Sequence, residues 1–283
     1  MSHSLRAVKG HGTENDFVLL PDLDAVLSMS PSLVRALCDR HAGIGADGVL
    51  RVVRTENATE PDVRAQAGEA EFFMDYHNAD GSIAEMCGNG VRVFARYLRT
   101  VGLVDGDTTI ATRGGPKSVT FSGDDVSVDM GAASYRPERP RVSASGLLGE
   151  YQGIAIDLPN PHVVVELADL ASLEALELWQ PPRVTPELPN GQNVEFVVRT
   201  SARRLSMRVH ERGVGETRSC GTGICAAVVA AAGDEAGEGQ WRVEVPGGRC
   251  TVGWTPDGSL ILTGPAVLVA EVQLGEQWLA EHR

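Results

Sequence analysis

Apolar residues recur along the chain in short alternating or continuous runs and in a few longer stretches with helical spacing. The short runs predict strands at 5–9, 16–20, 49–54, 71–76, 108–113, 117–121 and 126–130, and then at 153–158, 163–167, 193–198, 205–210, 241–245, 249–254 and 259–263. Helices are predicted from Ser30-Pro31 to about Arg40, around 170–178, and directly after Cys87 and Cys220. The polar segment 55–70 predicts a mobile insertion. This pattern indicates a mixed α/β (α+β) protein rich in antiparallel sheet.

The order of these elements repeats. "ENDFVLL" in the first half matches "PNPHVVV" in the second, since each places an Asn at a turn that leads into an apolar strand. About 60 to 70 residues later, each half reaches its cysteine and a helix. The Pro/Ser/Arg-rich segment 131–151 is expected to connect the halves. We therefore divide the chain into an N-terminal half, 1–130, and a C-terminal half, 131–264, and expect a ligand site where the two halves meet.

Composition narrows the function. Of the 283 residues, 42% are hydrophobic and 22% are charged, as in ordinary globular proteins, and the net charge is −13. That charge disfavours nucleic acid and anionic membranes as partners, because both require a basic face. With no apolar signal core at the N-terminus and no run long enough to span a bilayer, we expect a cytoplasmic protein. The five widely spaced cysteines are then expected to be reduced.

Two cysteines stand out because each precedes a helix in the same short motif. Cys87 begins Cys-Gly-Asn-Gly and Cys220 begins Cys-Gly-Thr-Gly. A helix N-terminus lowers the pKa of a thiol, and its amides can bind a carboxylate, so the motif suits chemistry on a carboxylic acid. The alternative is a buried cysteine followed by a tight turn, and for a single motif the two interpretations are equally plausible. Two motifs at matched positions favour function.

Inverting a carbon acid requires such a pair. One base removes the α-proton from one face while a conjugate acid delivers a proton to the other, and a thiolate and a thiol can exchange these roles. Helix-end amides would stabilise the negative charge that develops near the substrate carboxylate. No cofactor is required for this reaction in a dry, preorganised site.

Several polar residues are candidates for substrate binding. Four asparagines lie at turns or strand ends, where the plain interpretation is a turn former: Asn15, Asn78, Asn160 and Asn193. Glu211 and Arg212 directly precede the second cysteine loop and can either form a surface ion pair or hold an ammonium and a carboxylate. His162 heads an apolar strand and is as plausible in a core as in a site.

Other sites are disfavoured. "GIGADG", 43–48, fits a dinucleotide-binding pattern, but it follows a predicted helix and precedes a strand, the reverse of the required order. The histidines are scattered and no second cysteine pair accompanies Cys220 and Cys225, which argues against a metal site. Lysines are scarce, although pyridoxal phosphate enzymes need one. Cys38, Cys225 and Cys250 lie in apolar contexts and are expected to pack in the core.

Taken together, the chain resembles the diaminopimelate epimerases. The similar stretches are "KGHGTENDF", "RHAGIGADG", "NADGSIAEMCGNGVR", "NPHVVV", "NVEF" and "ERGVGETRSCGTG", in the family's order from Lys9 to Gly223. The combination is far more specific than any single motif. One departure is Val93, where many members have another cysteine. The segment 55–70 matches nothing familiar in that family, and His77 stands at a position where family residues vary, which leaves its role open.

The resemblance implies a homodimeric enzyme that needs no pyridoxal phosphate and interconverts LL- and meso-diaminopimelate in lysine and peptidoglycan-precursor biosynthesis. Its fold would be two pseudo-symmetric halves, each a mixed sheet wrapped around a central helix, with a C-terminal strand in 265–283 that returns to the first half. Cys87 and Cys220 would be the acid/base pair. The residues that would bind substrate are Asn15, Asn78, Gly88, Asn89, Asn160, Asn193, Glu211, Arg212, Gly221 and Thr222.

Three alternatives remain open. A proline or hydroxyproline racemase would share the cysteine pair but not Arg212 and the distal asparagines. A phenazine-type isomerase of the same fold would lack both cysteines. A redox-sensing protein would use Cys87 and Cys220 as a regulatory disulfide, and substrate would then fail to protect the thiols.

Overall fold

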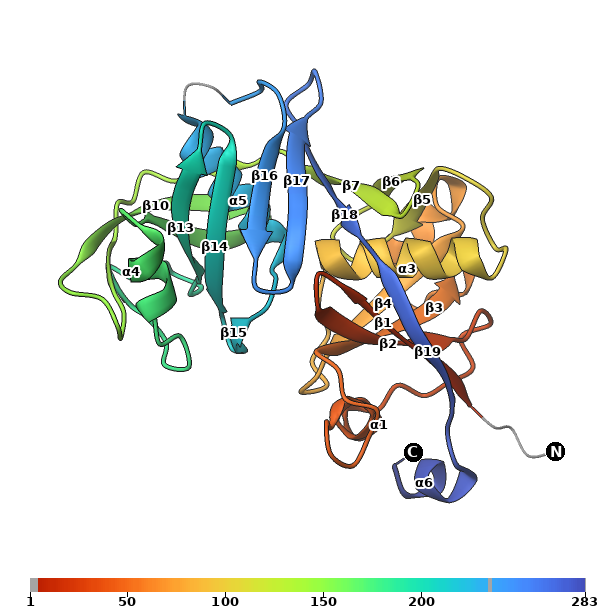
Figure 1. The fold of residues 1–283 in the computed structure, drawn as a ribbon. Helices are drawn as coiled ribbons and strands as arrows, with labels where there is room; N and C mark the ends of the chain where they lie inside the picture. The colour runs from red at the N-terminus through yellow and green to blue at the C-terminus, as the bar shows by residue number, and fades with distance from the viewer. Residues whose placement is uncertain (1–4, 234–235, 283) are drawn as a thin grey trace. The chain divides into compact units, whose positions relative to one another are not determined.

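The computed structural model describes residues 5–233 and 236–282. The chain forms two compact units, which are described separately below. Unit 1 contains the described residues up to Val128 and from Pro265 onward, and unit 2 is Asp129–Gly264. Figure 1 shows that a helix of about three turns lies among the strands of each unit, α3 in unit 1 and α5 in unit 2.

Unit 1 consists of strands around helix α3. Its strands are β1 (Arg6–Gly12), β2 (Asn15–Pro21), β3 (Gly48–Arg54), β4 (Phe72–Asn78), β5 (Thr108–Ala111), β6 (Lys117–Ser122), β7 (Asp125–Gly131, which ends in unit 2) and β19 (Val267–Gln273). Its helices are α1 (Pro31–Cys38), α2 (Pro61–Arg64), α3 (Gly88–Thr100), α6 (Glu276–His282) and the 3-10 turns η1 (Thr55–Asn57) and η2 (Ala65–Gly68).

Unit 2 repeats this order around helix α5. Its strands are β8 (Ser134–Tyr135), β9 (Arg141–Ser143), β10 (Tyr151–Leu158), β11 (Asn160–Glu166), β12 (Arg183–Thr185), β13 (Asn193–Ser201), β14 (Arg204–Glu211), β15 (Gly215–Thr217), β16 (Trp241–Val245), β17 (Gly248–Trp254) and β18 (Leu260–Pro265, which ends in unit 1). Its helices are α4 (Leu170–Ala175) and α5 (Gly221–Ala232).

The two units share one pairing scheme. In each, an antiparallel hairpin is followed by a parallel neighbour and then an antiparallel one: β1–β2, β2–β3 and β3–β4 in unit 1 correspond to β10–β11, β11–β13 and β13–β14 in unit 2. Helices α1 and α4 lie in the crossovers that the parallel pairs require. A further strand pairs with the first strand of each hairpin, β19 with β1 and β8 with β10. The predicted fold class is therefore confirmed.

Helices α3 and α5 each lie in the centre of their unit, because strands cover them on most sides. Helix α3 contacts β1, β2, β3, β5, β6 and β19, and α5 contacts β10, β11, β13, β14, β16 and β17. The Ala/Val sequence of α5 leaves few polar atoms to solvate, and nearly all of its residues are buried. Each helix begins at its Cys-Gly-x-Gly motif, with Cys87 and Cys220 as the N-cap residues.

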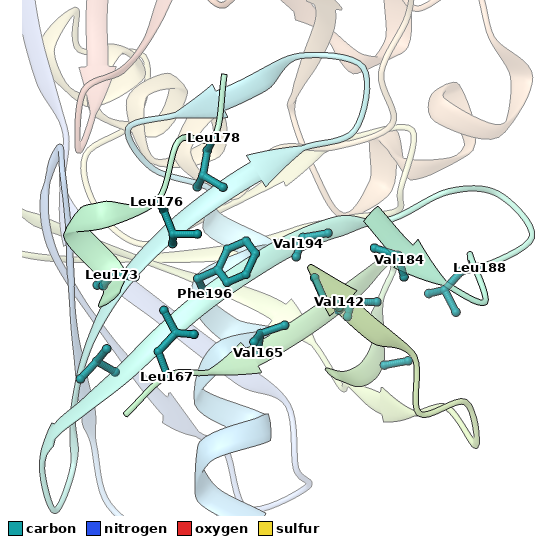
Figure 2. Packing of buried hydrophobic residues seen from close by; sticks show 13 residues of the cluster. Val142, Val165, Leu167, Leu173, Leu176, Leu178, Val184, Leu188, Val194 and Phe196 are labelled. Atoms are coloured by element: carbon teal, nitrogen blue, oxygen red, sulfur yellow. The ribbon is translucent and has the colours of Figure 1, made fainter. Parts of the chain in front are cut away.

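A second layer of core in unit 2 covers the other side of its sheet. Phe196 of β13 and Val165 of β11 face leucines from the α4 segment, including Leu173 and Leu176 (Figure 2). Burial of a leucine or phenylalanine contributes roughly 1.5–3 kcal/mol. This cluster therefore fixes β13, and with it the polar residues of β13 that face α5.

Most predicted strands are confirmed within about three residues, and the Ser30-Pro31 start of α1 is confirmed by a hydrogen bond from Leu33 N to Ser30 Oγ (3.1 Å).

The prediction of a mobile insertion at 55–70 was wrong. Most of its polar residues lie outward around Ala58, Val63 and Ala70, which are buried with Phe73, and the segment folds as helical turns. The short strands β8, β9, β12 and β15 and helix α6 were not predicted, because segments of this length carry little periodicity.

Candidate active site

Cys87 lies at the start of helix α3, where its sulfur accepts a hydrogen bond from Gly90 N at 3.4 Å. The thiol contacts Asn15 Oδ1 at 3.6 Å, and the side chain is half-buried. The sulfur thus replaces the oxygen of an ordinary N-cap residue, at the positive end of the helix dipole. The position suits a thiol that must gain and lose a proton.

A network of amides surrounds Cys87. Asn89 Nδ2 donates to Asn15 Oδ1 at 3.2 Å, and Asn15 Nδ2 donates to Asp47 Oδ2 at 2.7 Å. Arg92, which is fully buried, donates to Asn89 Oδ1 at 2.5 Å. Gly88 and Asn89 form the buried first turn of α3. The structure therefore brings Asn15, Gly88 and Asn89 together around the Cys87 sulfur.

Asp47 belongs to the "GIGADG" loop, which was predicted to be a turn. Besides holding Asn15, it accepts a hydrogen bond from Asp16 N at 3.1 Å and faces Arg40 at 2.7 Å. The loop is therefore a support for the turn that carries Asn15, a role that sequence patterns did not reveal. Asn78, at the end of β4, is half-buried and donates to Ser82 Oγ at 3.0 Å within the loop that leads to Cys87.

Cys220 is placed like Cys87 but in different surroundings. It is 5% exposed, and its sulfur lies 3.5 Å from Thr222 Oγ1. Burial raises the pKa of the Cys220 thiol well above its ordinary value, and the carboxylates of Glu211 and Glu195 raise it further. The expectation of a lowered pKa is therefore wrong for Cys220. A helix terminus contributes less than about 1 kcal/mol, whereas full burial changes a pKa by several units.

Glu211 and Arg212 follow one another at the end of β14 but face different environments. The Glu211 carboxylate accepts a hydrogen bond from Thr217 Oγ1, and burial raises the pKa of Glu211. Arg212 is exposed, and its guanidinium donates to the Asn190 carbonyl. The Arg212 amide donates to Asn193 Oδ1 at 2.9 Å. The pair is therefore not a surface ion pair, and Asn193 holds the backbone of Arg212, where the turn after β14 begins.

His162 is buried in a polar chain inside unit 2. Its Nδ1 lies 2.7 Å from Glu195 Oε1, and its Nε2 lies 3.1 Å from Asn160 Oδ1. His162 and Glu195 are both 0% exposed. A Cβ at Gly223 would come within 2.6 Å of Glu195 Oε1, so the last glycine of Cys-Gly-Thr-Gly makes room for this carboxylate below the first turn of α5.

Glu195 was missed by the sequence interpretation, although it belongs to the quoted "NVEF" stretch. The available signal was a carboxylate in the middle of an apolar strand, flanked by Val194 and Phe196, since a charged residue at such a position is rarely fully buried unless paired. In unit 2 the structure thus brings together Asn160, His162, Glu195, Glu211 and Cys220 with the buried Gly221 and Thr222 of the helix start.

A second polar cluster lies in unit 1. Asp75 of β4 pairs with Arg51 (3.3 Å), Arg113 (2.6 Å) and His77 (2.9 Å), and Arg113 also reaches Glu60 of the segment 55–70. These residues line a pocket of about 160 Å³. Burial opposes ionisation of Asp75, but hydrogen bonds from His77 and Arg113 outweigh it and lower the pKa to about 2. The cluster ties the segment 55–70 to β4, and it places His77 Nε2 2.9 Å from Asp75 Oδ1.

Among the described residues, no helix is long and apolar enough to cross a membrane. The same residues contain no group of three or more His, Cys, Asp and Glu side chains that could hold a metal ion. No disulfide joins any of the five cysteines, all of which lie in the described ranges.

Comparison with known proteins identifies the family of the chain. The family model described as diaminopimelate epimerase matches residues 7–136 and 154–269. Curated diaminopimelate epimerases are similar over nearly the whole chain. The protein of Streptomyces coelicolor is 50% identical, covering 99% of this chain and 98% of its own length. Those of Mycolicibacterium smegmatis and Thermobifida fusca are each 49% identical, covering 95% and 94% of this chain and 97% of their own lengths.

Solved structures share the fold at low sequence identity. A phenazine biosynthesis protein from Bacillus anthracis matches with a TM-score of 0.68 and 16% identity, covering 97% of this chain and all of its own. A hydroxyproline epimerase from Agrobacterium vitis matches with a TM-score of 0.66 and 14% identity, covering 96% of this chain and 92% of its own. At such identities the likeness supports the fold and not the substrate.

Proposed function

Because the chain belongs to the diaminopimelate epimerase family, we propose that it interconverts LL- and meso-2,6-diaminopimelate, a step in lysine and peptidoglycan-precursor biosynthesis. The observation that carries this proposal is the pair of cysteine motifs. In both units the N-cap residue of the buried central helix is a cysteine, surrounded by amides or carboxyl groups. Two equivalent thiols suit a reaction that needs one proton donor and one proton acceptor.

The proposed reaction uses Cys87 and Cys220 on opposite faces of one α-carbon. The thiolate of one takes the α-proton as the C–H bond breaks, and the thiol of the other donates its proton to the opposite face. The configuration inverts, and the two sulfurs exchange protonation states. Because burial and two nearby carboxylates raise the pKa of the Cys220 thiol, we assign the resting acid to Cys220 and the first base to Cys87. No step is assigned to a cofactor.

The reacting α-carboxylate gains negative charge in the transition state. Its proposed partners are the helix-start residues of both motifs and the nearby asparagines, namely Gly88, Asn89, Gly221, Thr222, Asn15 and Asn160. Backbone amides at helix N-termini suit this role because they are fixed in place before the reaction begins. Glu211 is assigned to the substrate ammonium, since its half-buried carboxyl group lies close enough to Cys220 to raise the pKa of the thiol.

Substrate choice should depend on the distal end of diaminopimelate. Arg212 is assigned to the distal carboxylate, with Asn78 and Asn193 as neutral partners. Arg212 suits this role because its guanidinium is exposed and its backbone is held by Asn193. A proline or hydroxyproline racemase would not require these residues. The shared fold of the Agrobacterium vitis enzyme does not favour that alternative, because identity to it is only 14%.

Exchange of the α-proton tests the proposal directly. In heavy water, LL-diaminopimelate should acquire deuterium at one α-carbon and yield the meso isomer, as followed by NMR and chiral chromatography. Lysine lacks the distal carboxylate and should exchange at least 100-fold more slowly, because the polar groups that bind this carboxylate would be unsatisfied. Equal exchange of lysine or proline would contradict the substrate assignment, even if both cysteines proved essential.

The assembly proposed is a homodimer, as the resemblance implies. Strand β19 carries Val267 and Val269, which are 43% and 58% exposed, and apolar side chains of this kind suit a subunit contact. Light scattering coupled to gel filtration should give about twice the mass of one 30.1 kDa chain.

A further inference from the structure

Glu195 is an acidic side chain inside an apolar strand. It lies in β13 between residues of the Phe196 core and is 0% exposed. One carboxylate oxygen, Oε1, pairs with His162, and the other, Oε2, has no hydrogen-bond partner among the described residues. Burying a carboxylate with an unpartnered oxygen costs free energy, and apolar residues often replace buried ion pairs without loss of stability. Stability alone therefore does not account for Glu195.

The partner of Glu195 connects it to a residue of the proposed site. His162 Nε2 lies 3.1 Å from Asn160 Oδ1, which can only accept a hydrogen bond, so Nε2 must carry a proton. A hydrogen bond between His162 Nδ1 and Glu195 Oε1, which are 2.7 Å apart, requires a further proton, and either atom can hold it. With its oxygen used by His162, Asn160 has amide N–H groups to offer to a substrate carboxylate. Replacing Glu195 would remove the group that sets this arrangement.

We propose that Glu195 is a positioning residue of the epimerase reaction, which holds His162 so that Asn160 presents its amide N–H groups to the substrate carboxylate. This inference rests on the proposed function. Glu195 does not itself contact the substrate. The other titratable groups near it are Glu211 of β14 and Cys220 at the start of α5, and the chain from Glu195 to Asn160 lies entirely within unit 2.

A double-mutant cycle tests this chain of contacts. Glu195→Gln keeps the side-chain shape, but an amide can turn either its oxygen or its nitrogen to His162 Nδ1, so it no longer fixes which ring nitrogen carries the proton or which way Asn160 is turned. We expect it to lower kcat/KM for LL-diaminopimelate 10-fold or more, mainly through KM, because binding of the carboxylate is impaired. In an Asn160→Ala background the same substitution should lower kcat/KM less than 3-fold, since the residue through which Glu195 acts is already gone. Equal losses in both backgrounds would overturn the proposal.

A matched control separates the loss of a charge from the loss of position. Glu244 lies on β16 of the same unit with an exposed side chain, and Glu244→Gln should leave kcat/KM unchanged within 2-fold.

Failure of the wild-type enzyme to exchange the α-proton of LL-diaminopimelate would refute the proposed function. Normal activity of Glu195→Gln beside an active wild type would refute only the role of Glu195.

A measurement on the wild-type protein covers the case in which Glu195→Gln does not fold. ¹⁵N NMR of histidine-labelled enzyme reports which ring nitrogens of His162 carry a proton. We expect a proton on Nε2 at the pH of the assay, with Nδ1 either protonated or hydrogen-bonded. A His162 with a bare Nε2 would overturn the proposal, because Asn160 would then be turned the other way.

Discussion

At the scale of single residues, Cys87 and Cys220 occupy equivalent positions but have different neighbours. Cys87 is half-buried beside the amides of Asn15 and Gly90, whereas Cys220 is buried near two carboxyl groups. The carboxylates of Glu195 and Glu211 oppose loss of the proton from the Cys220 thiol. Equivalent positions in a repeat thus acquire different chemical properties from their surroundings.

Removing either thiol should abolish epimerisation. Cys87→Ala and Cys220→Ala are each expected to lower kcat at least 10²–10⁴-fold, the usual contribution of a general acid or base. The control is Cys38→Ala, since Cys38 is buried at the end of α1 and contributes only to packing. It should keep kcat within a few-fold of wild type. Near wild-type turnover in either of the first two variants, measured by the deuterium assay, would refute the two-base mechanism.

The raised pKa of Cys220 predicts slow alkylation. Thiolate is the reactive form, so a raised pKa means less thiolate at any pH below it, and the rate should keep rising above pH 9. Mass spectrometry of the Cys220 peptide after timed exposure to iodoacetamide, without substrate, gives this pH profile. The same peptide in urea-unfolded protein should show its midpoint near the ordinary value, about 8.5. A midpoint below pH 8 in the folded protein would contradict the assignment of Cys220 as the resting acid.

At the scale of elements, the starts of α3 and α5 offer a matched comparison. Gly90 and Gly223 hold the same place in the two motifs. A Cβ at Gly90 would meet its nearest neighbours at 3.4 Å, an ordinary contact, whereas one at Gly223 would lie 2.6 Å from Glu195 Oε1. The glycine is therefore required by space only in α5.

Alanine substitutions should behave oppositely in the two helices. Gly90→Ala is expected to be neutral or to stabilise by up to about 1 kcal/mol, because alanine favours a helix over glycine. Gly223→Ala should destabilise by about 1–3 kcal/mol and lower activity, because it displaces the Glu195 carboxylate. Urea unfolding followed by circular dichroism measures both. Equal changes in the free energy of unfolding would show that the space around Glu195 does not matter.

At the scale of the whole molecule, a two-base mechanism requires Cys87 of unit 1 and Cys220 of unit 2 to approach one carbon atom. Without substrate, two such thiols should be able to form a disulfide. Diamide would then take up the two electrons and two protons that the thiols release. We expect an inactive enzyme with a Cys87–Cys220 bond that dithiothreitol reverses. Bound diaminopimelate should slow its formation, and peptide mapping that found the thiols bridged elsewhere would contradict the mechanism.

The sequence by itself determined the repeat, the fold class and the two cysteine helices. These follow from local information: strand and helix periods act over a few residues, and the Cys-Gly-x-Gly motif lies wholly within one turn. The match of Asn15 in β2 with Asn160 in β11 was visible for the same reason. The segment 55–70 was mistaken for a mobile insertion because its few apolar residues are covered only by Phe73 and its neighbours in space.

Only the tertiary structure decided the properties that depend on burial and on partners distant in sequence. The pKa of Cys220 rises because the folded chain removes the thiol from water and brings carboxyl groups near it. Glu195 meets His162 across 33 positions of sequence through the parallel pairing of β11 with β13. No local pattern contains such a pairing, because desolvation and charge interactions depend on distance in space and not on order along the chain.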